Sequence, residues 1–373
     1  MWLYDKMNQL KRLNIRNILM GNNTLEKISH GRDNNLNLVR LVGALMVMYM
    51  HSFALCQANL EEDLMYTLTF HKALSGQVGV DIFFVISGFL IYRSYERSSS
   101  LGKYFKARFL RIWPLLALFI LSTAFIFGPM FSTLSTADYY AGDKTGHVTT
   151  YLLNLIFLSS SNRLPGVFAF HINQSSNGSI WTLAYEVACY FLVIALVPLV
   201  KKYKKSIFAC IGISLALYLV ACYGLHTPNS VMANVGRLTL EFQVGSAYYI
   251  FRDKIIMSWK LLLVAIVGLF ATVYFADFEI AFTIFGAYII MYVGFSYFWI
   301  SKYYNKFGDI SYGVYILSFF VQQRVIDVMG KSPDGYQVLH MDPYVNLGVS
   351  LLIVIPLAFI SWHCFEKQLL KLK

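Results

Sequence analysis

Ten apolar segments, each about long enough for an α-helix to cross a lipid bilayer, divide this chain of 373 residues. Charged residues make up only 14% of the sequence, well below the roughly 25% that is typical of soluble domains. The sequence therefore predicts an all-α polytopic membrane protein with about ten transmembrane helices. We expect them near residues 36–56, 77–93, 112–129, 181–200, 206–223, 236–251, 258–275, 280–300, 311–329 and 344–364.

Lys and Arg residues cluster in alternate connections between these segments. Threading ten segments through a bilayer puts about 25 of them on one side, and leaves Lys72, Lys144, Arg163 and Lys331 on the other. Because cytoplasmic loops carry an excess of positive charge, we expect both termini in the cytoplasm. The net charge of +11 follows from this asymmetry. It indicates membrane lipids as neighbours and does not require a nucleic-acid partner.

One membrane domain, residues 36–366, is expected between a basic cytoplasmic arm at 1–35 and a cytoplasmic tail at 367–373. The arm is expected either to lie as a basic helix on an anionic leaflet or to be disordered. Residues 130–180 are expected to form the long outer loop. Its apolar piece at 151–158 is too short to cross, so we expect a re-entrant or interfacial segment there.

Cysteine spacing and motif content argue against several kinds of site. Five cysteines lie in or at the ends of apolar segments without CxxC pairing, which indicates neither a disulfide framework nor a zinc site: Cys56, Cys189, Cys210, Cys222 and Cys364. The motifs GxSxG, HExxH and the P-loop are absent, as is GxGxxG on a βαβ unit. We therefore expect no metal and no tightly bound cofactor.

Two ionisable residues, Arg40 and His51, interrupt the first apolar segment. Such residues inside a membrane helix are rare and usually functional. Eleven residues at about 100° each return His51 to within about 20° of Arg40, about 16 Å further along the axis. This spacing favours a site that binds an anion at one surface and performs chemistry at depth. The alternative is a snorkelling arginine and a histidine that bonds to a neighbouring helix.

Three carboxylates are expected at the depth of His51. Asp81, Glu186 and Glu241 lie about four or five residues from the outer ends of their segments, which puts them about 6–9 Å below the outer boundary. Lipid-facing charges would be costly at that depth, so these groups should face an internal cavity. Asp81 is the expected partner that orients His51, and Glu186 completes the catalytic set. For Asp81 and Glu241 the alternative is a structural polar network between helices.

Arg108 and Arg111 lie one helical turn apart just before Pro114, near Lys103 and Lys106. Two guanidinium groups on one helix face can bind phosphate oxygens in a bidentate manner. Anchoring of the helix at the cytoplasmic surface is the alternative reading.

Taken together in this order, these residues resemble the integral-membrane acyltransferase-3 family, bacterial enzymes that O-acetylate surface and secreted glycans. The match runs through most of the chain after Asn34. It rests on the Arg40-x10-His51 pattern, residues 76–91, the RxxRIxP stretch at 108–114 and the WTLAYE stretch at 181–186. Weaker similarity occurs at Gly236-Arg237, at 307–315 and at Glu366-Lys367.

The resemblance implies a bacterial inner-membrane enzyme that transfers an acetyl group from cytoplasmic acetyl-CoA to an extracytoplasmic glycan such as O-antigen or capsule. Acetyl-CoA would be a co-substrate held by Arg40, Arg108 and Arg111. His51 would act as general base or would carry the acyl group transiently. The acceptor, a lipid-linked or polymeric glycan, would meet the residues expected to bind substrate: Trp181, Tyr185, Arg237 and Glu241. Aromatic residues at membrane interfaces are also ordinary anchors.

The chain differs from many members of this family in two respects, and two other functions would suit its sequence. Ser318 stands where many relatives carry a histidine after the SYxxYL stretch. Some relatives append a periplasmic hydrolase-like domain, and we expect this chain to be a stand-alone membrane module. A glycan flippase or polymerase would also suit ten helices and a polar cavity, although it would not need the cytoplasmic arginines. A proton-coupled transporter would fit the buried carboxylates.

Overall fold

A long helix, in three places assembled from consecutive pieces, coincides with each of the ten predicted segments in the part of the chain that the computed structural model describes. The described residues are 23–30, 34–144, 146–158, 162–296, 304–331 and 339–372. The single long helices are α3 (Leu36–Leu55), α5 (Ser75–Arg97), α11 (Trp181–Lys202), α12 (Ser206–Leu219, extended by Val220–Gly224), α13 (Val231–Ile250), α14 (Trp259–Phe275) and α18 (Ser311–Met329).

The other three consist of consecutive helical pieces. Leu101–Ser122 (α6) continues through Thr123–Phe127 into α7 (Gly128–Phe131). Phe278–Ala281 (α15) continues through Phe282–Gly286 into α16 (Ala287–Phe295). Pro343–Ser361 (α19) continues through Trp362–Glu366 into α20 (Lys367–Leu369), followed by Leu370–Leu372.

Seven of these helices in the described residues are long and apolar enough to cross a membrane, which confirms the prediction of an all-α polytopic membrane protein. The helix α14 is apolar but shorter. The helices α13 and α18 carry more polar side chains, and most of their residues are buried in the protein. A helix that is enclosed by other helices need not present an apolar surface to lipid.

Polar side chains mark the beginnings of several helices. Ser100, Ser230 and Ser258 accept hydrogen bonds from backbone N–H groups in the first turns of α6, α13 and α14. Asp342 does the same for α19, where Pro343 occupies the first helical position. Each cap satisfies a backbone donor that has no partner inside the helix.

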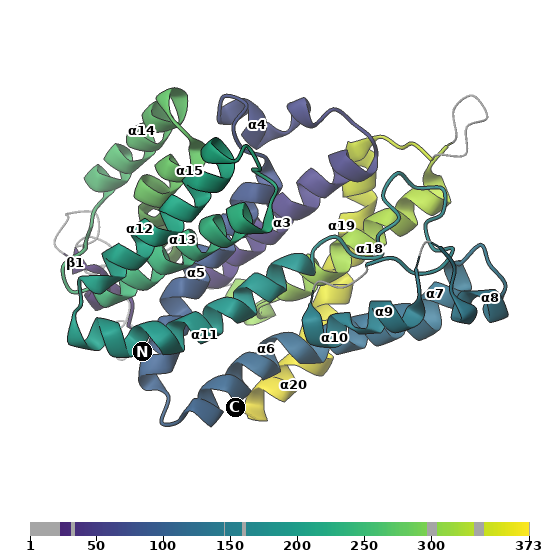
Figure 1. The fold of residues 1–373 in the computed structure, drawn as a ribbon, viewed down its shortest axis with the longest axis horizontal. Coiled ribbons are helices and arrows are strands. Elements are labelled where there is room, and N and C mark those ends of the chain that lie inside the picture. Colours follow the sequence, from purple (N-terminus) through teal and green to yellow (C-terminus); the bar gives the residue numbers. More distant parts are fainter. Residues whose placement is uncertain are drawn as a thin grey trace, which may run out of the picture.

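The centre of the bundle is α5, which packs against α3 on one side and α13 on the other (Figure 1). Glycine permits both contacts. A Cβ atom on Gly88 would lie 1.9 Å from the carbonyl oxygen of Phe242, and one on Gly79 would lie 2.4 Å from that of Gly43. A small residue at each position therefore permits the close contact between the helices.

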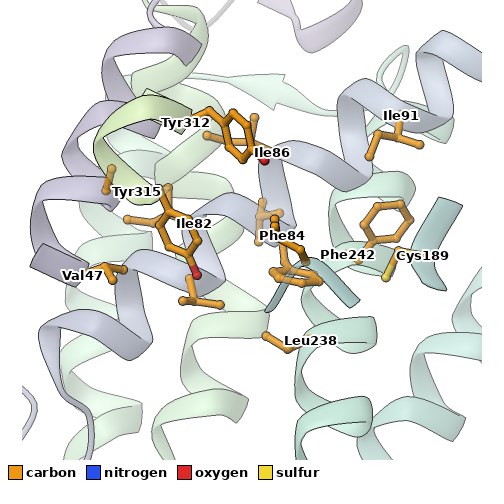
Figure 2. Packing of buried hydrophobic residues seen from close by; sticks show 14 of the residues in the cluster. Val47, Ile82, Phe84, Ile86, Ile91, Cys189, Leu238, Phe242, Tyr312 and Tyr315 are labelled. Carbon is orange, nitrogen blue, oxygen red and sulfur yellow. The ribbon is translucent and has the colours of Figure 1, made fainter. Parts of the chain in front are cut away.

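Side chains from α3, α5, α11, α13 and α18 meet in the apolar core around this contact (Figure 2). Phe84, Phe242 and Cys189 are among its buried members. The core fixes the positions of the polar residues that α3 and α5 carry between their apolar ones.

Smaller elements close the two ends of the bundle. The strand β1 (Asn23–Thr24) pairs antiparallel with β2 (Ile256–Met257), and α2 (Leu25–Ile28) follows β1. Leu60–Glu62 and α4 (Leu64–Leu68) connect α3 to α5. The predicted conformation of the N-terminal arm lies mostly outside the described residues, because 1–22 and 31–33 are not among them.

The long loop at 130–180 contains α8 (Thr136–Ala141), α9 (Val148–Leu152) and α10 (Asn154–Phe157). The apolar piece at 151–158 therefore forms two short helices beside α6, where the indole N–H of Trp113 donates to the carbonyl of Leu155 at 2.9 Å. The part of the loop that enters the bundle lies later. Ser176, Asn177 and Ser179 are buried, and the Asn177 amide donates to the carbonyl of Ile316 at 2.8 Å.

Candidate active site

Two cavities open toward opposite ends of the bundle, and a narrow neck lies between them. The loop-side cavity, about 530 Å³, is lined by His51, Gln77, Trp181, Arg237 and Tyr315 among others. The arginine cavity, about 840 Å³, is lined by Arg40, Arg108, Arg111, Glu186 and Tyr190 among others. The neck, about 40 Å³, shares Val80 and Tyr315 with the loop-side cavity and Arg40 and Glu186 with the arginine cavity.

One face of α5 lines this whole path. Gln77 and Val80 face the loop-side cavity, Phe83 lines the neck, and Ser87 and Ser94 face the arginine cavity. These residues are three, four or seven positions apart, which are the spacings of a single helix face. From Gln77 to Ser94 the helix rises about 25 Å, most of the roughly 30 Å of a bilayer core.

Arg40 and His51 both lie on α3, as the spacing predicted. Arg40 lines the neck and the arginine cavity, and His51 lines the loop-side cavity. The His51 ring packs edge-on against Phe319, with centroids 5.1 Å apart. Its Nδ1 is buried and has no hydrogen-bond partner among the described residues. This leaves Nε2 as the ring nitrogen that can meet a molecule in the cavity.

The predicted pairing of Asp81 with His51 is wrong in this structure. Asp81 is fully buried on α5 and accepts a hydrogen bond from Arg237 Nη1 at 2.7 Å. The same nitrogen lies 3.6 Å from Glu279 Oε1. A buried carboxylate is stabilised by a buried guanidinium much more than by a neutral imidazole, which accounts for this choice of partner.

Glu241, expected at the cavity as a substrate-binding residue, lies inside the protein instead. It is fully buried, and its Oε1 accepts a hydrogen bond from Thr283 at 2.6 Å. With Asp81, Arg237 and Glu279 it forms a polar cluster between α5, α13 and the α15–α16 helix, which fits the structural alternative considered for Asp81 and Glu241. Arg237 itself does line the loop-side cavity.

The three arginines expected to bind a phosphate group meet at the arginine cavity. Arg40 Nη1 and Arg111 Nη2 each lie 2.6 Å from the same oxygen, Asp309 Oδ2. Arg108 donates to Ser94 Oγ at 3.3 Å. Arg93, Arg97 and Lys103 also line this cavity, whereas Glu186 is the carboxylate on its wall. The cavity is therefore strongly cationic.

Asp309, in the loop before α18, pairs with two of the site arginines and is not among the predicted site residues. Burial would raise the pKa of its carboxyl, but Arg111 and Arg40 together with hydrogen bonds from Ser311 lower the pKa to about 2. The carboxylate is thus ionised and holds the two guanidinium groups side by side. The weaker family similarity at 307–315, which includes Asp309, is the sequence feature that could have identified it.

Glu186 lies on the wall of the arginine cavity and the neck, so its predicted placement in one layer with His51 is wrong. Its Oε1 accepts a hydrogen bond from Tyr190 at 2.7 Å. The predicted depth of Glu186 assumes that α11 begins at the membrane surface. Because the preceding residues 176–180 enter the bundle, α11 begins inside the protein and Glu186 lies deeper.

Trp181 lines the loop-side cavity, as expected of a substrate-binding residue. Tyr185 packs edge-on against its ring, with centroids 5.6 Å apart, and so supports the indole. Ser318, which replaces the histidine of many relatives, is fully buried, and its hydroxyl donates to the carbonyl of Tyr315 at 3.5 Å. The Tyr315 hydroxyl lies 2.6 Å from Thr182 Oγ1 at the neck.

Comparison with known proteins identifies the family of this chain. A family model described as "Acyltransferase domain" matches residues 33–363. A curated relative, "O-acetyl transferase" from Shigella phage Sf6, is 31% identical over 355 residues, which cover 91% of this chain and 96% of the relative. "Nodulation protein 10" from Rhizobium leguminosarum bv. viciae is 30% identical over 189 residues, 48% of each chain. No solved structure matches. The chain therefore belongs to the acyltransferase-3 family and is a polytopic membrane acyltransferase.

Proposed function

We propose that this acyltransferase moves an acetyl group from acetyl-CoA to a hydroxyl group of a glycan on the opposite side of a bacterial inner membrane. One observation carries the proposal. A cationic cavity and a cavity that contains His51 open toward opposite ends of one bundle and meet at a neck. An enzyme that works on one side of the membrane would need only one of them.

The arginine cavity suits the donor. Its guanidinium groups can bind the phosphates of CoA, because Arg forms bidentate, charge-assisted hydrogen bonds with phosphate oxygens. The Lys and Arg residues at this end, such as Arg97 and Lys103, support a cytoplasmic position for this cavity, because cytoplasmic loops carry an excess of positive charge. Both chain termini would then be cytoplasmic, and the thioester would extend through the neck toward His51.

In the proposed reaction His51 Nε2 removes the proton of the acceptor hydroxyl, and the hydroxyl oxygen attacks the thioester carbonyl carbon. A C–O bond forms and the C–S bond breaks. The departing thiolate takes the proton from the imidazolium, so that free CoA, an O-acetylated acceptor and neutral His51 result. Asp81 and Glu186 contribute to this step only indirectly. Asp81 holds Arg237 in place, and Glu186 holds Tyr190 in place.

The loop-side cavity suits the acceptor, because it is polar, faces the end of the bundle that carries few cations and contains His51. The name of the Shigella phage relative supports O-acetylation. We propose a lipid-linked or polymeric surface glycan, such as O-antigen or capsule, as the acceptor.

Expression in a bacterial host whose surface glycan lacks O-acetyl groups tests this function. We expect NMR spectra of the purified glycan to show new O-acetyl signals, which cells with an empty vector lack. Absence of O-acetyl signals, together with no acetyl transfer from acetyl-CoA by the purified protein, would contradict the proposal.

A further inference from the structure

The charged side chains at the outer part of the loop-side cavity already have protein partners. Lys72 Nζ donates to the carbonyls of Val273 at 2.5 Å and Ala276 at 2.6 Å, at the C-terminal end of α14. The carboxylate of Asp277 caps α15 and accepts hydrogen bonds from Tyr223 at 2.6 Å and Tyr218 at 3.1 Å. These two residues carry opposite charges, and their polar atoms are engaged within the protein.

The polar side chains on the deeper wall of the same cavity also have partners within the protein. The Arg237 guanidinium is held by Asp81 and lies near Glu279, so two buried carboxylates offset its charge. Gln77 Nε2 donates to Glu279 Oε1 at 2.5 Å. An anion that entered the cavity would therefore find each cation on this wall already satisfied.

Besides His51 and Ser179, three polar side chains on the cavity wall remain available for a ligand. The amides of Asn229 and Asn234 and the indole N–H of Trp181 line the cavity and make no hydrogen bond within the described part of the chain. Asn234 is half-buried on α13, three residues before Arg237 and on the same face. Trp181 is held by Tyr185 beside Ser179, which also lines the cavity. All three groups are uncharged.

We propose that the loop-side cavity binds an uncharged sugar unit of the acceptor, and that Asn234 and Trp181 determine this specificity. The inference rests on the proposed function and adds the chemical class of the acceptor unit next to His51. An amide both donates and accepts hydrogen bonds, as sugar hydroxyl groups do. Trp offers a broad apolar face and one N–H donor, which suits the apolar face of a sugar ring with a hydroxyl at its edge.

A uronic acid or a phosphorylated sugar is excluded by the cost of desolvation. A carboxylate that leaves water for a site whose cations already bind protein groups loses hydration that these cations replace only in part. A neutral sugar ring loses only the hydrogen bonds between its hydroxyl groups and water. The amides and the indole N–H can replace these hydrogen bonds.

Saturation-transfer NMR on the purified full-length protein in detergent tests the proposal. The probes are methyl α-D-glucopyranoside and the corresponding methyl glucuronide at neutral pH. We expect saturation of the neutral glycoside and about tenfold less of the glucuronide, because a site built for hydroxyl groups discriminates strongly against a mismatched group. Asn234→Ala and the conservative Trp181→Phe should each weaken the signal of the neutral glycoside.

The matched control is Asn59→Ala, which removes an amide at the cap of the short helix 60–62, away from the cavities. It should leave both signals unchanged. Equal or stronger saturation of the glucuronide would overturn the proposal. So would a neutral-glycoside signal that survives in both cavity variants. Because binding is measured without acetyl-CoA, these failures are distinct from failure of acetyl transfer.

Discussion

Replacement of His51 by alanine is expected to lower the rate of acetyl transfer by about 10²–10⁴-fold, the usual contribution of a general base. His51 lines the loop-side cavity, and its Nδ1 is turned into the protein. The alanine side chain has no basic atom that could accept the proton of the acceptor hydroxyl. The rate is measured as transfer of labelled acetyl groups to purified glycan, at matched protein levels.

The variant should still bind acetyl-CoA, because the arginine cavity lies beyond the neck. The exposed His147, in the 130–180 loop just before α9, supplies the matched control. His147→Ala removes the same side chain away from both cavities and should transfer at the normal rate. Normal activity of His51→Ala would remove His51 from the mechanism.

The second large effect is expected for Arg111. Arg111→Ala should raise the Kd for acetyl-CoA by about 10–100-fold, because a hydrogen bond to a charged group contributes about 1.5–3 kcal/mol. It would also leave Asp309 with Arg40 as its remaining guanidinium partner. Arg111→Lys should recover part of the affinity, since it keeps the charge without the bidentate geometry. Calorimetric titration of the purified protein measures these affinities.

Arg252 provides a control at the same end of the bundle. It pairs with Glu26 and packs over the Tyr249 ring, outside the arginine cavity. Arg252→Ala should bind acetyl-CoA normally. An unchanged Kd in Arg111→Ala would show that Arg111 does not contribute to donor binding.

The helices and the separation of Arg40 from His51 could be predicted because both depend on local properties. Apolar length determines whether a helix can cross, and residue spacing on one continuous helix determines which groups share a face. That Arg40, Arg108 and Arg111 line one cavity could also be predicted, because all three were expected at the same side of the membrane.

The partners of the buried carboxylates could not be predicted in this way. Depth along a helix does not reveal which neighbour lies across from a side chain, so Asp81 was assigned to His51 and not to Arg237. Glu186 was misplaced because α11 starts inside the protein, after a loop whose polar sequence gives no sign that it enters the bundle. Asp309 lies outside the apolar segments and was overlooked for that reason.

The most direct test of transfer across the membrane uses sealed inside-out vesicles that contain the protein, with acceptor glycan enclosed in the lumen. Labelled acetyl-CoA, which does not cross the bilayer, is added only outside, where the cytoplasmic face is exposed. Our account predicts O-acetylated glycan inside intact vesicles with the wild type and none with His51→Ala. Acetylation only after the vesicles are opened, so that donor and acceptor share one side, would contradict it.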